Sequence, residues 1–124
     1  MGDTSENTGG LPWWVILSDR SSIKTLEVFS WLTNAGFNAY VPQVFERGKH
    51  RAIFAGYVFV QCGDWTIDDI RPVIRYKKFL APRGVIARVT ALEIEDMQRA
   101  VAACAVVPKP TALRGKIIKK YSVN

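Results

Sequence analysis

The sequence predicts an α+β fold, in which a mainly antiparallel four-stranded sheet is flanked by three helices. Stretches of strand-like composition alternate with amphipathic stretches in the order strand, helix, strand, strand, helix, strand, helix. Short connections and a charged turn between the second and third strands indicate antiparallel pairing. The chain has 124 residues, of which 48% are hydrophobic, enough for the core of one domain that we expect to span residues 12–107.

A strand and a helix begin the domain, after a flexible polar leader at residues 1–11. The run WWVILS, residues 13–18, is apolar and of strand length, which predicts a central strand. The helix that follows has apolar residues at a spacing of three: Ile23, Leu26, Phe29 and Leu32. Ser21 or Ser22 can cap its first turn, and Gly36 suits the left-handed backbone that often follows a last turn.

Two strand-like segments then face each other across a turn. The sequences FNAYVPQVF (residues 37–45) and AIFAGYVFVQC (residues 52–62) predict the arms of a hairpin whose charged turn has Gly48 at its tip. Pro42 should place part of the first arm at a sheet edge or a bulge. Side chains of the second arm alternate between two faces, with Tyr57 and Phe59 on one and Val58, Val60 and Cys62 on the other.

Two helices and two extended segments complete the prediction. The spacing of Thr66 and Asp69 is that of a capping box, and Pro72 limits the helix that they begin to about one or two turns. The sequences KKFLAP and GVIARV predict short extended stretches. The sequence TALEIEDMQRAVAAC predicts the clearest helix of the chain, with Thr90 and Glu93 as its capping box.

The composition favours a basic binding protein over an enzyme. The formal net charge is +6, and residues 108–124 form a basic tail or truncated linker, so an anionic partner such as nucleic acid is expected. His50, the only histidine, lies in the charged turn, while Cys62 and Cys104 lie in apolar patterns typical of core positions. We therefore expect no catalysis, no metal site and no cofactor, in a cytoplasmic protein without a membrane span.

The sequence FAGYVFVQC, residues 54–62, partly matches the third strand of an RNA-recognition motif. That motif presents spaced aromatic side chains to nucleic-acid bases. The matching positions are Gly56, Tyr57, Phe59 and Val60. The positions that depart from it are Ala55, Val58 and Cys62. One interpretation is therefore an autonomous RNA- or DNA-binding domain.

A second resemblance covers residues 13–104. The sequences WWVILS, YVPQ, FAGYVFV and VTALEIEDMQ, in this order, resemble the N-terminal (NGN) domain of the NusG family of transcription elongation factors. The matching positions are Trp13 and Trp14, Val41 and Pro42, Phe54 to Val60, Arg71, Phe79, and Thr90 onward. Ala55 departs from the pattern because it stands where the family usually has Pro. The resemblance implies the ferredoxin-like arrangement that this domain shares with the RNA-recognition motif.

The same resemblance implies a function in transcription elongation or antitermination. It implies that an apolar sheet face binds the clamp helices of RNA polymerase and so modulates pausing, through Phe54, Tyr57, Val15, Leu17, Phe59 and Phe79. It also implies that basic residues lie near the upstream fork or the non-template DNA: Arg20, Lys24, Arg71, Arg75, Lys77 and Lys78. The KOW domain of the family has no counterpart in the sequence. We therefore expect no coupling to Rho or the ribosome. We also expect a monomer that binds DNA weakly on its own, because salt screens exposed charges.

Overall fold

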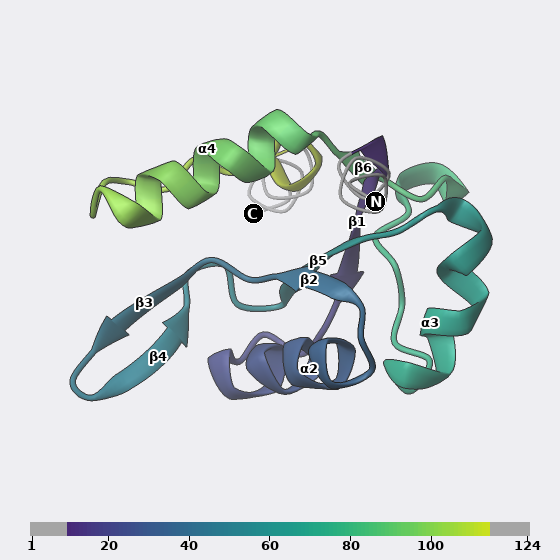
Figure 1. Ribbon diagram of the computed structural model, residues 1–124, viewed down its shortest axis with the longest axis horizontal. Coiled ribbons are helices and arrows are strands. Elements are labelled where there is room, and N and C mark those ends of the chain that lie inside the picture. The colour runs from purple at the N-terminus through teal and green to yellow at the C-terminus, as the bar shows by residue number, and fades with distance from the viewer. Residues whose placement is uncertain (1–9, 115–124) are drawn as a thin grey trace, which may run out of the picture.

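A four-stranded antiparallel sheet forms the middle layer of the protein in a computed structural model that describes residues 10–114 (Figure 1). The order across the sheet is β2 (Asn38–Tyr40), β5 (Tyr57–Gln61), β1 (Trp13–Leu17) and β6 (Arg88–Val89). All three pairings are antiparallel, and β1 and β5 share the longest ladder, from Trp13 opposite Gln61 to Leu17 opposite Tyr57. The predicted α+β fold with its four-stranded sheet is thereby confirmed.

Helices cover both faces of this sheet (Figure 1). On one face lie α2 (Ser22–Asn34) and α3 (Ile67–Val73), which follows the 3₁₀ turn η1 (Asp64–Thr66). On the other face lies α4 (Ala91–Ala102). Because successive side chains of a strand point to opposite faces, the central strands supply two separate cores. Trp14 belongs to the core under α2 and α3, and its neighbour Trp13 to the core under α4.

The predicted hairpin is divided between two sheets, which corrects the expectation of one continuous pair of arms. β2 pairs with β5 in the main sheet, whereas β3 (Gln43–Glu46) pairs with β4 (Lys49–Ala52) in a ribbon that projects beyond it (Figure 1). The division occurs at Pro42, which has no N–H to continue a ladder. The ribbon is closed by Arg47 and Gly48, whose positive φ angles of 53° and 76° are typical of a tight two-residue hairpin turn.

The helix starts agree with the sequence in two of three cases. Ser21 caps α2 by accepting a hydrogen bond from the Lys24 backbone N–H at 3.1 Å, and Thr90 and Glu93 form the predicted capping box of α4. The predicted cap at Thr66 is wrong. Its backbone is already helical, at φ −94° and ψ −11°, whereas an N-cap residue needs an extended backbone.

The buried stripe of α2 also differs from the predicted one. Ile23 is 80% exposed, and Thr25 takes the buried position instead, together with Val28 and Leu32. Thr25 can be buried because its hydroxyl is satisfied: it donates to the Ser21 carbonyl at 2.7 Å and accepts from the Gly56 N–H at 2.7 Å. The spacing of apolar residues alone therefore placed the centre of the stripe incorrectly.

The two predicted extended segments after α3 share one edge of β1. Phe79 forms a single bridge with Ile16, and β6 pairs with the opposite end of β1. Between them the chain leaves the edge through the 3₁₀ turn η2 (Pro82–Gly84). Cys62 is buried as expected, but Cys104 is exposed just after α4, so its assignment to the core is wrong. Cys104 follows the C-cap residue Ala103, beyond Ile94 and Met97, the buried residues of α4.

Candidate functional site

The six residues that the resemblance assigned to polymerase contact do not form one open surface. Val15 and Phe59 are fully buried, and Tyr57 is only 7% exposed, in the core between the sheet and α4. Phe79 packs in the other core, on the opposite face of the sheet. Two of the six, Leu17 and Phe54, are half-buried. These two are the members of the set that a partner can reach in this conformation.

The aromatic sheet face is covered by α4 together with the segment that follows it. Ile94 and Met97 of α4 pack against the face, and so does Leu113, which is fully buried. The Thr111 backbone N–H donates a hydrogen bond of 2.8 Å to Oε2 of Glu93, which ties this segment to the first turn of α4. The cover is therefore an integral part of the fold.

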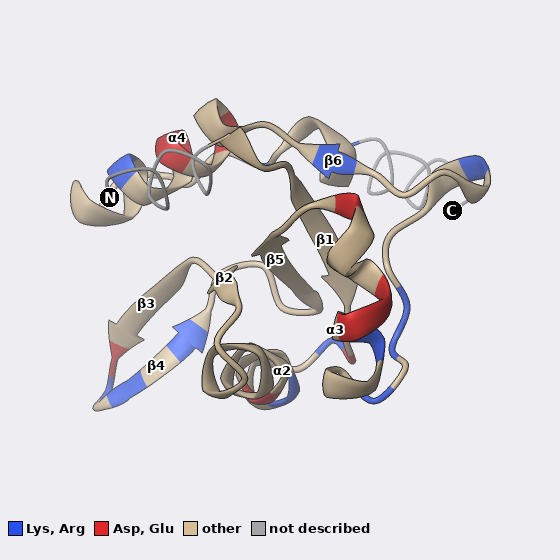
Figure 2. Ribbon diagram, turned by 45° about the vertical axis from the view of Figure 1, so that its right-hand side comes forward, with Lys and Arg blue, Asp and Glu red and all other residues tan. Residues whose placement is uncertain are grey.

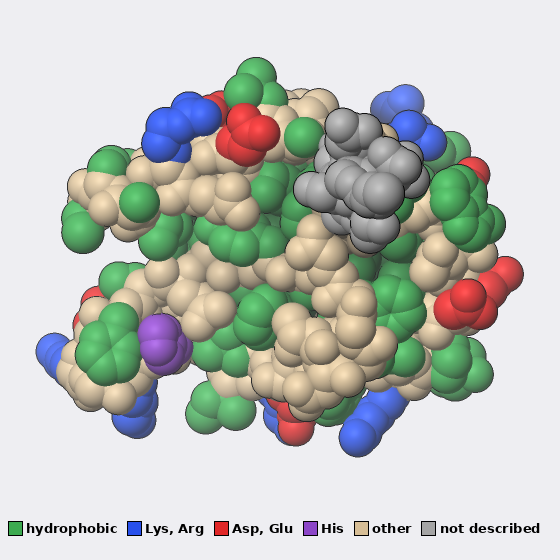
Figure 3. All heavy atoms as spheres, viewed as in Figure 1, with side chains coloured by type: hydrophobic (Ala, Val, Ile, Leu, Met, Phe, Trp, Pro, Cys, Tyr) green, Lys and Arg blue, Asp and Glu red, His purple; other side chains and the backbone are tan. Residues whose placement is uncertain are grey.

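An apolar rim remains at the edge of this core, formed by Leu17, Tyr40 and Phe54. All three are partly buried and pack against the core under α4. Tyr40 ends β2 and Phe54 precedes β5, so both lie where the ribbon leaves the main sheet. In the space-filling view the surface is hollowed between α4 and the β3–β4 ribbon, with hydrophobic side chains inside the hollow (Figure 3). Burial raises the pKa of the Tyr40 hydroxyl, which therefore stays protonated.

Gly56 connects the apolar rim to the start of α2. Its φ of +100° is accessible mainly to glycine, and a Cβ atom there would lie 3.3 Å from Cγ of Arg20. Its N–H donates to the buried hydroxyl of Thr25 on α2. The glycine of the FAGY sequence is thus required for close contact between the strand and the helix start.

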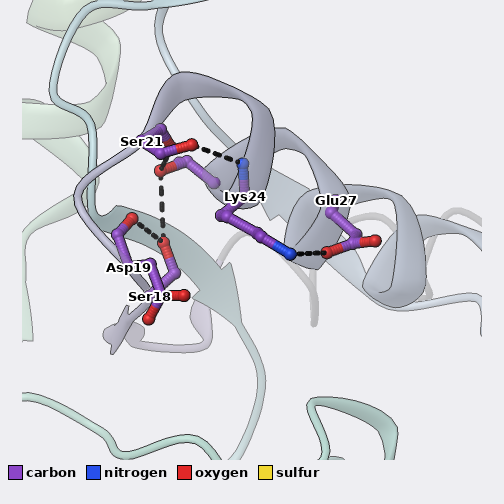
Figure 4. Close-up of polar contacts among 6 residues, drawn as sticks. Ser18, Asp19, Ser21, Lys24 and Glu27 are labelled. Atoms are coloured by element: carbon purple, nitrogen blue, oxygen red, sulfur yellow. Dashed lines mark hydrogen bonds and ion pairs between the residues drawn. The ribbon is translucent and has the colours of Figure 1, made fainter.

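The start of α2 presents two of the predicted cationic residues to solvent. Arg20 and Lys24 are both exposed. In Figure 4 the Lys24 side chain extends along the helix toward Glu27, and the distance from its Nζ to the Glu27 carboxylate is 3.9 Å. Such an exposed ion pair contributes little to stability, so Lys24 can exchange Glu27 for another anion. Ser18, Asp19 and Ser21 form the polar turn that precedes the helix (Figure 4).

The structure brings this helix start together with the basic segment that follows α3. The Leu17 N–H donates to the Lys78 carbonyl at 2.8 Å, next to the turn that leads into α2. The Arg75 guanidinium lies 4.2 Å from the ring centroid of Trp31, which shares a helix face with Lys24 seven residues earlier. We call the combined surface the basic strip, which comprises Arg20, Lys24, Arg71, Arg75, Lys77 and Lys78. Lys and Arg positions gather where this segment passes beside α2 (Figure 2).

Arg71 is held at the inner side of the basic strip. Its guanidinium lies 5.4 Å from the Phe79 ring centroid and 3.3 Å from a carboxylate oxygen of Asp68. Asp68 is 93% exposed, so this ion pair is screened by solvent and contributes little. Among the described residues, the ion pairs of the strip involve Lys24 and Arg71, so the strip has a net positive charge, which favours an anionic partner.

Tyr76 is the residue of this surface that the sequence analysis missed. It is 72% exposed and lies between Arg75 and Lys77. A detectable signal was present in the sequence RYKK, where an aromatic residue interrupts a run of cations. That combination is typical of single-stranded nucleic-acid binding, because the ring can stack on a base while the cations contact phosphates.

The buried thiol of Cys62 is not activated as a nucleophile. Burial raises the pKa of the Cys62 thiol to about 11, with a smaller contribution from Asp64, while a hydrogen bond involving Trp14 lowers it. That thiol is therefore protonated at neutral pH and a poor nucleophile. Within residues 10–114 there is no group of three His, Cys, Asp or Glu residues that could hold a metal ion. None of the helices in the same range is long and apolar enough to cross a membrane.

Comparisons of the chain with protein-family models, with curated proteins and with solved structures found no match.

Proposed function

We propose that this protein is a transcription elongation factor that binds RNA polymerase through the apolar rim and holds the basic strip beside DNA. The observation that carries the proposal is the apolar rim, because it leaves Phe54 and Leu17 only partly buried beside the core under α4. The α+β architecture and the NusG-like order of motifs support the same function. The polymerase, its clamp helices and the effect on pausing are parts of this proposal.

An apolar rim of this kind suits a helical partner. Helices dock into grooves through a few apolar anchors, and each anchor can contribute about 2 kcal/mol or more. Phe54 and Leu17 provide anchoring contacts here, whereas the buried residues Tyr57 and Phe59 shape the floor beneath them. The proposed contact is thus smaller than the whole aromatic face expected from the sequence.

The decisive experiment is a binding assay between the purified protein and core RNA polymerase. We predict that Phe54→Ala weakens binding about tenfold or more, the scale of one interface anchor. Leu92→Ala is the matched control, because Leu92 is an exposed apolar residue on the outer side of α4, 62% exposed. Both variants should retain the circular dichroism spectrum of the parent. Failure of the parent to bind polymerase, or equal binding by parent and Phe54→Ala, would refute the proposal.

An autonomous nucleic-acid-binding domain is the second candidate function, and the exposed Tyr76 within the basic strip favours it. The RNA-recognition form of this hypothesis requires Tyr57 and Phe59 to stack on bases. Both rings lie beneath α4, so they would be accessible only if α4 moved away. The same polymerase assay separates the two candidates, because an autonomous domain has no need of polymerase.

A further inference from the structure

The turn that ends α3 has an unusual residue in its left-handed position. The Arg75 N–H donates to the Pro72 carbonyl at 3.1 Å, and the Tyr76 N–H donates to the Arg71 carbonyl at 2.8 Å. This pair of bonds defines a Schellman helix end, in which the first donor normally belongs to glycine. Here that residue is Arg75, with φ 55°, and Tyr76 follows with φ 60°. Two successive side-chain-bearing residues in the left-handed region are strained.

The same chain uses glycine at an equivalent helix end. At the end of α2 the Gly36 N–H donates to the Thr33 carbonyl at 3.1 Å, and the Phe37 N–H donates to the Leu32 carbonyl at 3.0 Å. The bonding pattern is the same, and the left-handed residue, with φ 90°, is glycine. The hydrogen bonds of this turn can therefore form with glycine in the left-handed position, so they do not require the arginine found at the end of α3. Such strain is typical of functional positions.

The strained turn holds the Arg75 side chain against α2 but leaves the Tyr76 side chain exposed. The Arg75 guanidinium packs over the Trp31 ring at 4.2 Å, which restrains the turn against α2. Tyr76, the next residue, is 72% exposed to solvent. The backbone after it is also held, because the Lys77 N–H donates to the Ile74 carbonyl at 3.1 Å and the Lys78 carbonyl accepts from Leu17. An exposed aromatic ring is thus presented on a fixed backbone.

Cations surround this ring on both sides in the sequence. Arg75 precedes Tyr76, and Lys77 and Lys78 follow it. In the preceding helix, Asp68 pairs with Arg71. Phosphates are the anions that such a cluster attracts, and every nucleobase offers a flat face on which a tyrosine ring can stack.

We propose that the Arg75–Tyr76 turn binds an unpaired base of single-stranded nucleic acid. The Tyr76 ring stacks on the base, and Lys77, Lys78 and Arg75 contact the flanking phosphates. This inference rests on the part of the proposed function in which the basic strip contacts nucleic acid. It adds that the ligand of the strip is single-stranded nucleic acid. In a duplex the bases are stacked on one another. The Tyr76 ring could therefore stack only on the terminal base pair, and the cations would contact only the phosphates.

The test measures fluorescence anisotropy of labelled oligonucleotides of about 15 nucleotides at low salt, a length within the range of single-strand binding sites. The probes are oligothymidylate, oligouridylate, an abasic strand with the same phosphates, and a duplex. We expect the parent to bind the two base-containing strands about fivefold or more tightly than the abasic strand, the scale of one stacked base. Tyr76→Ala should remove this preference, and Tyr76→Phe should retain it.

Two controls separate stacking from general effects. Trp65→Ala removes an equally exposed ring, 76% exposed, at the opposite end of α3 beside Asp64, and should leave the preference unchanged. Arg75→Gly places the residue that this turn favours at the left-handed position, so the variant should fold while its binding to every probe weakens.

Several results would overturn the inference. These are equal affinity of the parent for base-containing and abasic strands, tighter binding of the duplex than of either single strand, or an unchanged base preference in Tyr76→Ala. Competition by polyglutamate as effective as by the oligonucleotides would show that the strip binds any polyanion, which also overturns it. No polymerase is present in the assay. A loss of base preference therefore leaves the polymerase proposal intact, and a failure to bind polymerase leaves this inference intact.

Discussion

Glu93 connects the first turn of α4 to the segment that closes the core. Its Oε1 accepts a hydrogen bond from the Thr90 N–H at 3.0 Å, and its Oε2 accepts one from the Thr111 N–H at 2.8 Å. The first bond completes the capping box, and the second fixes the chain two residues before the buried Leu113. One carboxylate therefore holds both parts of the cover over the aromatic sheet face.

The hydrogen bonds of Glu93 make its contribution depend on pH. Burial acts to raise the pKa of Glu93, but hydrogen bonds from Thr111 and Thr90 outweigh it and lower the pKa below its ordinary value of 4.5. A carboxyl group with a lowered folded-state pKa stabilises the fold above its unfolded-state pKa. That stabilisation is lost as the pH falls through the folded-state pKa.

We therefore predict that Glu93→Ala destabilises the protein at pH 7 by about 1 kcal/mol, the scale of a lost helix cap. The difference in free energy of unfolding between parent and variant should shrink as the pH falls below about 4. Urea unfolding followed by circular dichroism measures both quantities. Glu95→Ala is the control, since Glu95 makes only an exposed ion pair with Arg99 at 3.9 Å. An equal effect of the two substitutions would contradict the prediction.

At the scale of elements, the ends of α2, α3 and α4 share one hydrogen-bonding pattern but not one residue type. At α4 the Cys104 N–H donates to the Val101 carbonyl at 3.1 Å, and the Ala105 N–H donates to the Ala100 carbonyl at 2.9 Å. Cys104 has φ 54° and is exposed. Glycine would occupy this position without strain, as Gly36 does after α2.

We predict that Cys104→Gly raises the free energy of unfolding by roughly 1 kcal/mol, the scale of one relieved left-handed residue. The reverse change, Gly36→Ala, should lower it by a similar amount, because φ 90° is strained for alanine although no clash arises. Thermal unfolding under reducing conditions compares the two variants with the parent. Shifts of the same sign for both variants would show that left-handed strain does not govern these helix ends.

Local signals in the sequence were sufficient to predict several helices and strands. They did not predict which part of the chain covers the aromatic sheet face. The capping box of Thr90 and Glu93 and the opposite faces of Tyr57 and Val58 follow from neighbouring residues, and the structure confirms both. An apolar strand face, however, has the same composition whether its own helix or a partner protein covers it. The sequence alone therefore could not show that α4 and Leu113 cover the face expected to bind polymerase. The position of Tyr76 likewise depends on a backbone turn with an atypical residue.

At the scale of the whole molecule, the apolar rim and the basic strip are joined through a rigid connection. Phe54 lies two residues before Gly56, and Gly56 packs against Arg20 and donates to Thr25. A partner held at the rim thus fixes the position of the strip relative to that partner. Two weak contacts joined in this way reinforce each other, because the first raises the effective concentration for the second.

The formal net charge of +6 alone does not produce tight DNA binding, because salt screens exposed charges. We expect the free protein to bind duplex DNA with a dissociation constant of about 10⁻⁴–10⁻⁶ M, the range of non-specific contacts. A strip variant in which four cations become Gln should bind bare polymerase as the parent does but affect elongation less, and most clearly at low salt. The substituted residues are Arg71, Arg75, Lys77 and Lys78.

The measurement is pausing by purified polymerase on a defined template at several salt concentrations. The matched control removes the same charge elsewhere on the surface, by Gln substitution of four exposed residues: Arg83, Arg88, Arg99 and Arg114. The four control cations lie outside the basic strip that the apolar rim positions. If the location of the cations decides the effect, the control variant should change pausing much less than the strip variant. Equal losses in the two variants would mean that net charge alone acts on the DNA, and the strip would lose its assigned role.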